Sequence, residues 1–463
     1  MLSTDKCIPF DFNMPIYNWF YPMSYQEIKV DKDTINSIFN QEDKRVTNRA
    51  LYFHIPFCQD ICSFCPFTRE VLKSDSYLDR YVDALIKEIQ MKARYPYISN
   101  KPITAIFFGG GTPSILKPKH IRKIGQAIHD NFDLSQIKEF SFEMNAKTVL
   151  PERIEALKEI GVTHGRMGVQ TFNPDYREMF KLTATLQNIY DGAKLLNSAF
   201  DNVCIDMLYG MHGQSLSDIV RDMKQAMGLG TSHMDVYPIN NGVIQKRLKD
   251  EYLRRNYKAS TGLDKYLYNI VIYEYLKRNG FDVHNGHGYF RTNKSNKLGD
   301  FVNNNYTFQY HESVYGYSGH EIIAFGPVGY SVLNEYVVGN LADIRTYIET
   351  VEGGNLPIAG VGIYPRELTE IKGITLHLPY HGVAYKSQID FNYVNSDLLE
   401  KINNLIKFGM VIEHTDRYAL TQLGWYNYVN LLFYLSPQCE QDSLMKYIKD
   451  ANIIDDFVCT LDF

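Results

Sequence analysis

From residue 51 to residue 238, short apolar runs alternate with longer segments whose apolar residues recur at helical spacing. The first run, LYFHIPF, leads through a cysteine-rich loop into a segment with apolar residues at 78, 82, 85, 86 and 89. That spacing places them on one face of a helix. The same unit repeats with the runs TAIFFGGG, EFSFEMN, THGRMGVQTF, NVCIDMLYG and SHMDVYPIN.

Strands that alternate with helices predict βα units and a parallel sheet. The pattern contains six such strands, fewer than the eight that close a TIM barrel. We therefore predict an α/β fold built on an open, partial (β/α)6 barrel of the TIM type. In such folds the functional site lies at the C-terminal ends of the strands.

The pattern divides the chain into four parts. Residues 1–46 form an aromatic N-terminal extension, which either folds over the mouth of the barrel or packs on its exterior, and residues 47–255 form the barrel. Residues 256–365 extend the barrel and contain an insert rich in asparagine and glycine, HNGHGYFRTNKSNKLGDFVNNNY, which predicts loops or short edge strands. Residues 366–463 form a C-terminal domain.

The C-terminal domain combines an amphipathic helix with two short strands. Apolar residues at 398, 399, 402, 405 and 406 mark the helix, which ends at Gly409, and the strands flank Thr415 and Asp416. This order predicts a small winged-helix-like α+β domain. Because the charge of the chain is nearly balanced, we expect a lid or a structural cap rather than a DNA reader.

Composition and charge narrow the class of protein. The 463-residue chain is 45% hydrophobic, which is enough for a large core, and its formal net charge is -5 with both signs interspersed. We therefore expect no nucleic-acid partner and no anionic membrane surface. The first residues, MLSTDKCIPFDFNMP, lack an export signal, and no stretch reaches the ~18 continuous apolar residues of a membrane span. These features predict a cytoplasmic protein.

Three of the seven cysteines lie close together, at Cys58, Cys62 and Cys65, and the other four are scattered. This distribution indicates a metal site in a reducing compartment rather than a disulfide framework. The spacing C-x3-C-x2-C can ligate three irons of a 4Fe-4S cluster and leave the fourth iron open. A zinc site and three unrelated buried cysteines are the alternatives. Zinc prefers four ligands, and the loop holds no fourth cysteine or histidine.

The segment YFHIPFCQDICSFC resembles the radical SAM superfamily, and within it the branch that contains the oxygen-independent coproporphyrinogen oxidase HemN and the haem chaperone HemW. The resemblance continues in the family's order through GGGTPSIL, FEMN, GVQTFN, NVCIDMLYG and AFGPVGYSVLNEY, and it covers roughly residues 47–436. It implies a 4Fe-4S cluster on the three cysteines that splits S-adenosylmethionine into a 5'-deoxyadenosyl radical.

The resemblance also implies roles for single residues. Tyr52 would contact S-adenosylmethionine through its hydroxyl, and Phe64 would lay its backbone along the adenine. Gly110, Gly111 and Thr112 match the turn that receives the methionine end, where a close approach to backbone favours residues without a β-carbon. A plain strand aromatic is the alternative for Tyr52.

Three polar residues, Glu143, Gln170 and Asp206, end the third, fourth and fifth predicted strands and match ligand contacts in the family. Helix capping or solvation of a strand end is the alternative. Glu143 and Tyr52 are the expected catalytic residues. Tyr237, at the end of the sixth strand, falls where the family places an aromatic near a second S-adenosylmethionine. We therefore expect two molecules of this cofactor.

The sequence departs from HemN in two places. The family has a further cysteine two positions after the third ligand, where this chain has Phe67. It has an arginine twelve positions after the motif glutamine, where this chain has Leu182, with Lys181 beside it and Arg177 nearby. A tetracarboxylate porphyrinogen needs paired cations in its pocket, so oxidation of coproporphyrinogen is disfavoured.

The leading hypothesis is a HemN-like radical C-methylation or alkylation of a flat conjugated acceptor, either a tetrapyrrole or an aromatic natural product. The 35 tyrosines leave scope for a stacking pocket. A flavodoxin- or ferredoxin-type donor would reduce the cluster, and the chain would act as a monomer. The alternatives are oxidative decarboxylation and a HemW-like haem chaperone with His284 and His287 as axial ligands. Histidines in a loop rich in glycine and asparagine are, however, more often exposed to solvent.

Overall fold

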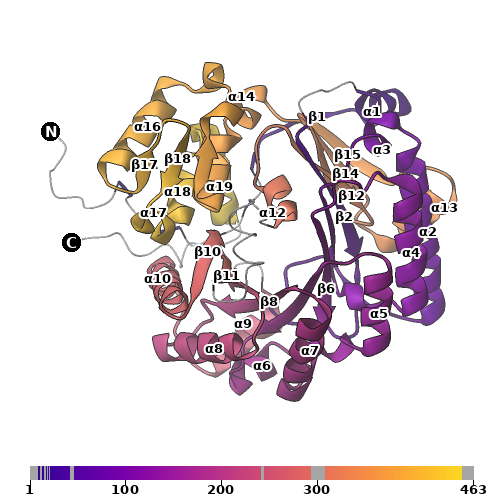
Figure 1. The fold of residues 1–463 in the computed structure, drawn as a ribbon, viewed down its shortest axis with the longest axis horizontal. Coiled ribbons are helices and arrows are strands. Elements are labelled where there is room, and N and C mark those ends of the chain that lie inside the picture. The colour runs from indigo at the N-terminus through magenta and orange to yellow at the C-terminus, as the bar shows by residue number, and fades with distance from the viewer. Residues whose placement is uncertain are drawn as a thin grey trace.

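The computed structural model describes residues 9–10, 13–14, 17, 19, 21–41, 46–240, 244–292 and 308–450. Most of the predicted N-terminal extension before residue 21 and residues 293–307 of the predicted insert lie outside these ranges. In the described chain a 13-stranded sheet bends around the interior with helices on its outer face, and a smaller domain lies opposite the sheet (Figure 1). The strand order is β1-β15-β14-β13-β12-β2-β5-β6-β7-β8-β9-β11-β10.

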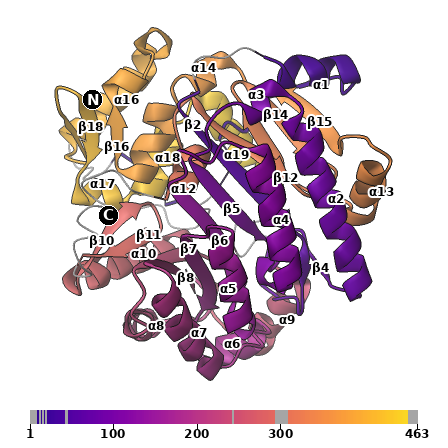
Figure 2. The same ribbon diagram turned by 45° about the vertical axis from the view of Figure 1, so that its right-hand side comes forward.

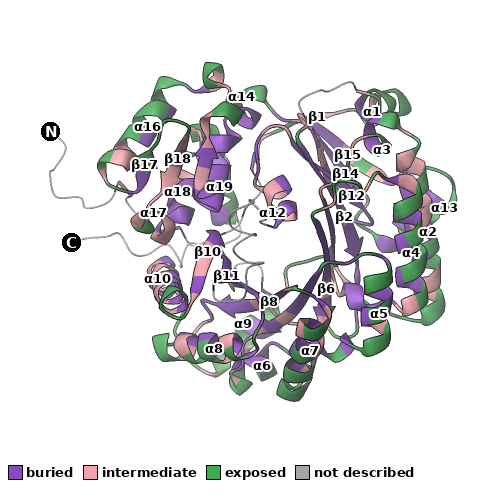
Figure 3. Ribbon diagram, in the orientation of Figure 1, coloured by how far each residue is buried: buried purple, intermediate pink, exposed green. Residues whose placement is uncertain are grey.

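Six parallel strands form the centre of the sheet, so the predicted α/β partial barrel is confirmed. They are β2 (Asn48–Ile55), β5 (Ala105–Gly110), β6 (Glu139–Asn145), β7 (His164–Gln170), β8 (Asn202–Tyr209) and β9 (His233–Pro238), hydrogen-bonded in that order. The strands are buried, whereas the covering helices present exposed residues on their outward side (Figure 3).

Most of the helices that cover the barrel lie at the predicted positions, whereas those at 174–179 and 246–254 were not predicted. The covering helices are α2 (Asp75–Ala93), α4 (Pro118–Asn131), α5 (Pro151–Glu159), α6 (Pro174–Met179), α7 (Leu186–Ala199), α8 (Leu216–Gly228), α9 (Lys246–Arg254) and α10 (Gly262–Arg278). Shorter or peripheral elements are α1 (Lys32–Phe39), α3 (Pro96–Ser99), α13 (Ile344–Glu352) and the β3–β4 pair (Phe57–Cys58 and Glu70–Val71). Among the described residues, no helix has the length and apolar character needed to cross a membrane.

A seventh parallel strand, β12 (His320–Phe325), pairs with β2 on the side away from β5 (Figure 2). The sequence pattern did not predict it, because its apolar run is short and begins beside two polar residues. Antiparallel strands then widen the sheet on both sides: β13 (Tyr330–Leu333), β14 (Tyr336–Asn340), β15 (Ile358–Ile363) and β1 (Gln26–Ile28) beyond β12, and β11 (Gly288–Arg291) and β10 (Phe281–Asn285) beyond β9.

A buried ion pair explains how β12 can carry a glutamate. Arg49 of β2 donates from Nε to Glu321 of β12 over 3.0 Å, and both side chains are almost fully buried. The tyrosine hydroxyl of Tyr97 also donates to Glu321. Because the two charges compensate one another inside the protein, the pair ties the seventh strand to the first.

The C-terminal domain contains the predicted helix and hairpin. Helix α16 (Ser396–Lys407) precedes β17 (Val411–Glu413) and β18 (Arg417–Leu420), and β16 (Val383–Tyr385) adds a third strand to the hairpin. The other helices are α14 (Arg366–Thr369), α15 (Leu378–His381), α17 (Gln422–Tyr426), α18 (Tyr428–Leu435) and α19 (Gln438–Asp450), with a π-helical turn at Gly373–His377. From the N-terminal extension, Tyr17 packs against Tyr428 of this domain and Tyr209 of the barrel.

A short helix, α12 (Gln309–Val314), lies inside the ring between the sheet and the C-terminal domain (Figures 1 and 2). It lies just after the insert for which we predicted loops or edge strands, at positions where no helix was predicted. His311 and Glu312 are consecutive on α12 and serve different neighbours. Glu312 accepts a hydrogen bond from His377 over 2.9 Å, with His381 3.7 Å away, and thus fastens α12 to the C-terminal domain.

We predict that Glu321→Leu lowers the free energy of unfolding by about 3–5 kcal/mol, because Arg49 is left as an unpaired buried charge. The double variant Arg49→Leu/Glu321→Leu should recover part of this loss, since neither charge then remains buried. Urea denaturation of the three proteins measures both effects. The exposed pair Arg80–Glu352 provides a control, and Glu352→Gln should shift the midpoint far less. A single variant as stable as the double would contradict the assignment.

Candidate active site

The cysteine loop begins at the end of β3 and presents three free thiols. Cys58 is buried, whereas Cys62 and Cys65 are partly exposed. Burial, and then the nearby thiols of Cys65 and Cys58, raise the pKa of Cys62 to about 12. The hydroxyl of Thr112 donates to Cys58 Sγ over 3.4 Å. The three sulfurs therefore interact with one another, as the ligands of one metal group would.

The loop fits a 4Fe-4S cluster with an open iron better than it fits zinc. It supplies three thiols, and the other described cysteines lie elsewhere, Cys204 on β8 and Cys439 on α19. Three thiolates match three irons of a cubane, whereas structural zinc takes four ligands. Burial raises the pKa of all three thiols, and the positive charge of Arg69, whose guanidinium donates to the backbone oxygen of Cys62 over 3.4 Å, partly offsets the rise. This cation favours the thiolate forms that iron needs.

The four predicted strand-end residues lie on neighbouring strands of the barrel. Glu143, Gln170, Asp206 and Tyr237 stand toward the C-terminal ends of β6, β7, β8 and β9. Gln170 has a positive φ of 73°, at a bulge where the register of β7 against β8 shifts. A non-glycine residue rarely adopts this conformation without a local reason. The placement agrees with a site at this end of the barrel.

Glu143 is partly buried beside the glycine turn. Burial, and then the neighbouring carboxylate of Asp206, raise its pKa to about 8, while the backbone N–H of Gly110 and the positive charge of Arg166 partly offset the rise. The unliganded side chain is therefore largely protonated at neutral pH. A cationic ligand beside it would favour the ionised form.

Tyr52 is committed to contacts within the chain. Its hydroxyl lies 3.0 Å from Nδ1 of His54, and its ring stacks with Phe107 and Tyr310 at centroid distances of 6.3 and 5.9 Å. Phe107 and Tyr310 stack at 4.3 Å. The stack forms an aromatic wall inside the barrel.

Other residues of the chain occupy the space beside the glycine turn. A β-carbon at Gly110, which has a φ of +111°, would meet the imidazole of His54 at 2.8 Å, and one at Gly111 would meet the backbone oxygen of Phe57 at the same distance. The packing of the chain itself thus requires glycine here. Phe64 is partly buried, with its ring 5.0 Å from that of Phe180.

Two charged residues of the interior did not emerge from the sequence. Arg166 on β7 is almost fully buried and donates to Asp206 over 3.1 Å and to Asp235 on β9. Burial raises the pKa of Asp206 to about 6 despite the guanidinium. For Asp235 burial also raises the pKa, but Arg166 together with the nearby histidines outweighs it and the pKa is lowered. Arg166 and Asp235 alternate with other inward-facing residues in HGRMGV and HMDVYP. This alternation could have indicated that both side chains face the interior.

The positions at which the sequence departs from HemN hold no free arginine. Arg177 is buried and donates to the backbone oxygens of Val169 and Thr171 over 3.2 and 2.8 Å. Lys181 is exposed and Leu182 is partly buried. Both line a cleft of about 680 Å³ that also contains Asp60 of the cysteine loop.

The two histidines proposed as haem ligands are buried, so the interpretation that they are exposed to solvent is wrong. His284 and His287 lie at the hairpin β10–β11, which the C-terminal domain covers. The hydroxyl of Tyr380 lies 3.0 and 2.8 Å from the two ring nitrogens of His287, and a β-carbon at Gly286 would meet the ring of Tyr428 at 2.3 Å. The loop composition could not show this cover.

Residues 52–226 match the model of the radical SAM superfamily. The chain contains a radical SAM domain. It is 29% identical to the haem chaperone HemW of Lactococcus lactis over 65% of this chain and 74% of that protein. It is 32% identical to the anaerobilin synthase of Escherichia coli O157:H7 over 42% of this chain and 43% of that protein.

Among solved structures, the fold is similar to that of coproporphyrinogen III oxidase HemN from Escherichia coli, with a TM-score of 0.71 and 18% identity over 90% of this chain and 96% of that one. The radical SAM domain of this chain therefore sits in a HemN-like fold. None of the three proteins is named as a methyltransferase.

We predict that, without bound ligands, the stability of the parent relative to the variant Glu143→Gln falls as pH rises from 5 to 8. The folded pKa of Glu143, about 8, lies above that of an unfolded glutamate, so the folded protein binds more protons in this window. The stability of the parent relative to the variant should decline by roughly 1.4 kcal/mol per pH unit. Chemical denaturation at each pH measures it, with the exposed Glu155→Gln as control. Parallel profiles of parent and Glu143→Gln would contradict the shift.

Proposed function

We propose that the chain is an enzyme that reductively cleaves S-adenosylmethionine at a 4Fe-4S cluster held by Cys58, Cys62 and Cys65. It directs the resulting radical at a flat conjugated acceptor, a tetrapyrrole or an aromatic natural product. The proposal is supported by the three free thiols of one loop, by the hydrogen bond from Thr112 to Cys58, and by the interaction of Cys65 with Glu143 of β6. The radical SAM domain supports it.

When bound, the cluster supplies the electron that breaks a carbon–sulfur bond of S-adenosylmethionine. The residues of the chain bind and orient that molecule. Glu143, ionised in the complex, accepts from the ammonium group, and the turn Gly110–Thr112 receives the methionine end through its backbone. Gln170 and Asp206 contact the adenosyl part, Phe64 flanks the adenine, and Tyr52 limits the pocket.

The aromatic wall and the engaged arginines favour methyl or alkyl transfer over decarboxylation. Tyr52, Phe107 and Tyr310 offer flat faces to a conjugated ring. Arg166 is bound to two carboxylates and Arg177 to backbone oxygens, so neither is available for the carboxylates of a porphyrinogen. In this proposal a second S-adenosylmethionine near Tyr237 supplies the transferred carbon.

The electron would come from a flavodoxin- or ferredoxin-type donor that docks beside the cysteine loop of a monomer in the cytoplasm. Two large apolar side chains on this loop support the docking site. Phe67 is 60% exposed and Val71 is 47% exposed, both within a few positions of Cys65. An exposed apolar patch of this kind suits a transient partner.

We predict that the reconstituted enzyme, assayed without oxygen with dithionite and S-adenosylmethionine, forms 5'-deoxyadenosine and, with a suitable tetrapyrrole, also S-adenosylhomocysteine. Mass spectrometry measures both products. Cys58→Ala/Cys62→Ala/Cys65→Ala should abolish both, because no cluster forms, whereas the exposed Cys439→Ala should retain them. Formation of 5'-deoxyadenosine alone, with release of carbon dioxide, would replace methyl transfer by oxidative decarboxylation.

The buried histidines favour a second candidate, a haem chaperone. His284 and His287 lie in an enclosed hairpin, where a haem iron could replace their present partners. The chain also matches 74% of the length of a haem chaperone, HemW of Lactococcus lactis. Titration with haem tests this function. A Soret shift at stoichiometric haem that His284→Ala weakens would support it, and the absence of any shift would exclude it.

A further inference from the structure

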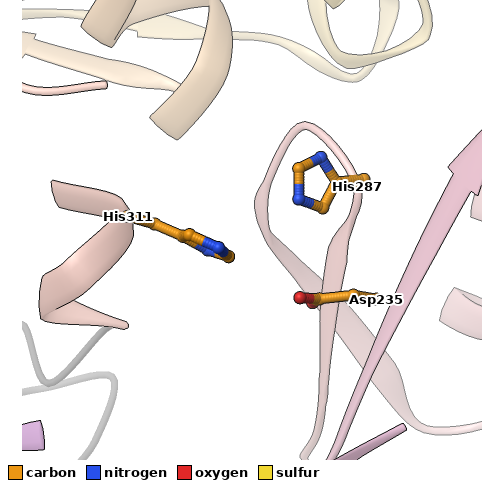
Figure 4. Close-up of side chains that lie close together, drawn as sticks. All are labelled: Asp235, His287 and His311. Atoms are coloured by element: carbon orange, nitrogen blue, oxygen red, sulfur yellow. The ribbon is translucent and has the colours of Figure 1, made fainter. Parts of the chain in front are cut away.

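Three buried side chains from distant parts of the sequence converge in the barrel interior (Figure 4). Asp235 comes from β9, His287 from the turn between β10 and β11, and His311 from α12. One carboxylate oxygen and one nitrogen of each ring lie within 4.8 Å of one another. The side chains are 0%, 2% and 7% exposed. No single motif of the sequence contains the three residues, because their positions span 76 residues.

The carboxylate of Asp235 is only half satisfied by the described protein. Its Oδ2 accepts hydrogen bonds from Arg166 and, over 3.1 Å, from the hydroxyl of Tyr237. Its Oδ1 is buried and has no hydrogen-bond partner. A buried carboxylate oxygen without a partner is costly, and native proteins rarely leave one so. One carboxylate oxygen of Asp235 lies beside the two imidazoles, so the carboxylate and both rings could share one bound ion.

We propose that Asp235, His287 and His311 bind one divalent transition-metal ion, zinc or ferrous iron, distinct from the iron of the cysteine loop. One carboxylate and two imidazoles are a donor set that suits both ions. Donor atoms that share an ion at ~2.1 Å in a tetrahedral site lie about 3.4 Å apart, so donor pairs at the 4.8 Å limit need to close by about 1.4 Å. A fourth position stays open to a ligand from the barrel interior.

The surroundings hold the ligands as an outer shell would. Tyr380, from the C-terminal domain, contacts the ring of His287 through its hydroxyl. The side chain of Asn285 accepts from the backbone N–H of His287 over 3.1 Å and lies 3.3 Å from Nδ1 of His311. Such contacts fix ring orientation at metal sites, and their loss commonly costs 10- to 100-fold in metal affinity.

The local charges also admit a cation. Arg166 provides one positive charge to two carboxylates, those of Asp206 and Asp235. A divalent ion at Oδ1 of Asp235 would compensate the second carboxylate. An ordered water could bridge the same three side chains without any metal, and this is the competing occupant that an experiment must separate.

The metal content of full-length Cys58→Ala/Cys62→Ala/Cys65→Ala decides between them, because this background carries no cluster iron or cysteine-bound metal at the loop. We expect about one zinc or iron per chain after desalting, by mass spectrometry of the metals. Titration of the metal-stripped protein with Co2+ should give d–d absorption bands. Adding Asp235→Asn, His287→Ala or His311→Ala should abolish both signals.

Two matched variants guard against simple misfolding. His284→Ala removes a buried histidine of the same hairpin that is outside the triad, and it should retain the metal. Tyr380→Phe, a mild change, should weaken Co2+ binding about 10- to 100-fold. Circular dichroism checks the fold of each protein. A parent without metal or Co2+ bands would assign the site to water and overturn the proposal, as would metal retained after loss of His287 or His311.

Discussion

The barrel interior depends on one buried guanidinium. Arg166 stands on the central strand β7 and holds the carboxylates of β8 and β9 through Asp206 and Asp235. Its planar group also lies over the rings of Phe107 and Phe308, at 5.6 and 5.1 Å. A buried charge is tolerated only when paired, so this one residue fixes the spacing of three strands and the direction of two acidic side chains. The spacing of these strands in turn sets the positions of the strand-end residues that are candidates for ligand contacts.

The pattern of the sequence was sufficient for the central barrel, because strands and helices there follow their characteristic periods without interruption. It also located the polar residues at the strand ends, since consecutive parallel strands finish at one edge. It missed β12, where Glu321 interrupts the apolar run and is compensated only by Arg49, a residue 272 positions away. The roles of the strand-end residues remain predictions from the family resemblance.

Long-range contacts explain the other omissions. His284 and His287 lie in a polar, glycine-containing turn and are buried by residues distant in sequence, among them Phe308 against His284 and Tyr237 and Tyr380 against His287. Asp235 and Arg166 occupy inward positions that a period of two could indicate, but their pairing depends on the register between β7, β8 and β9. The role of the GGGT glycines in receiving a ligand stays a prediction, and the atoms that exclude a β-carbon at Gly110 and Gly111 belong to His54 and Phe57.

Helix α12 connects the barrel to the C-terminal domain. His311 points into the barrel, whereas the adjacent Glu312 is hydrogen-bonded to His377 of the C-terminal domain. Consecutive residues of one helix therefore contact the two parts of the molecule. Separation of the C-terminal domain from the barrel must therefore either draw α12 out with it or break the hydrogen bond between Glu312 and His377. In the first case the aromatic wall loses Tyr310 at the same moment. Movement of α12 with the C-terminal domain would thus open the molecule and disrupt the aromatic wall in one step.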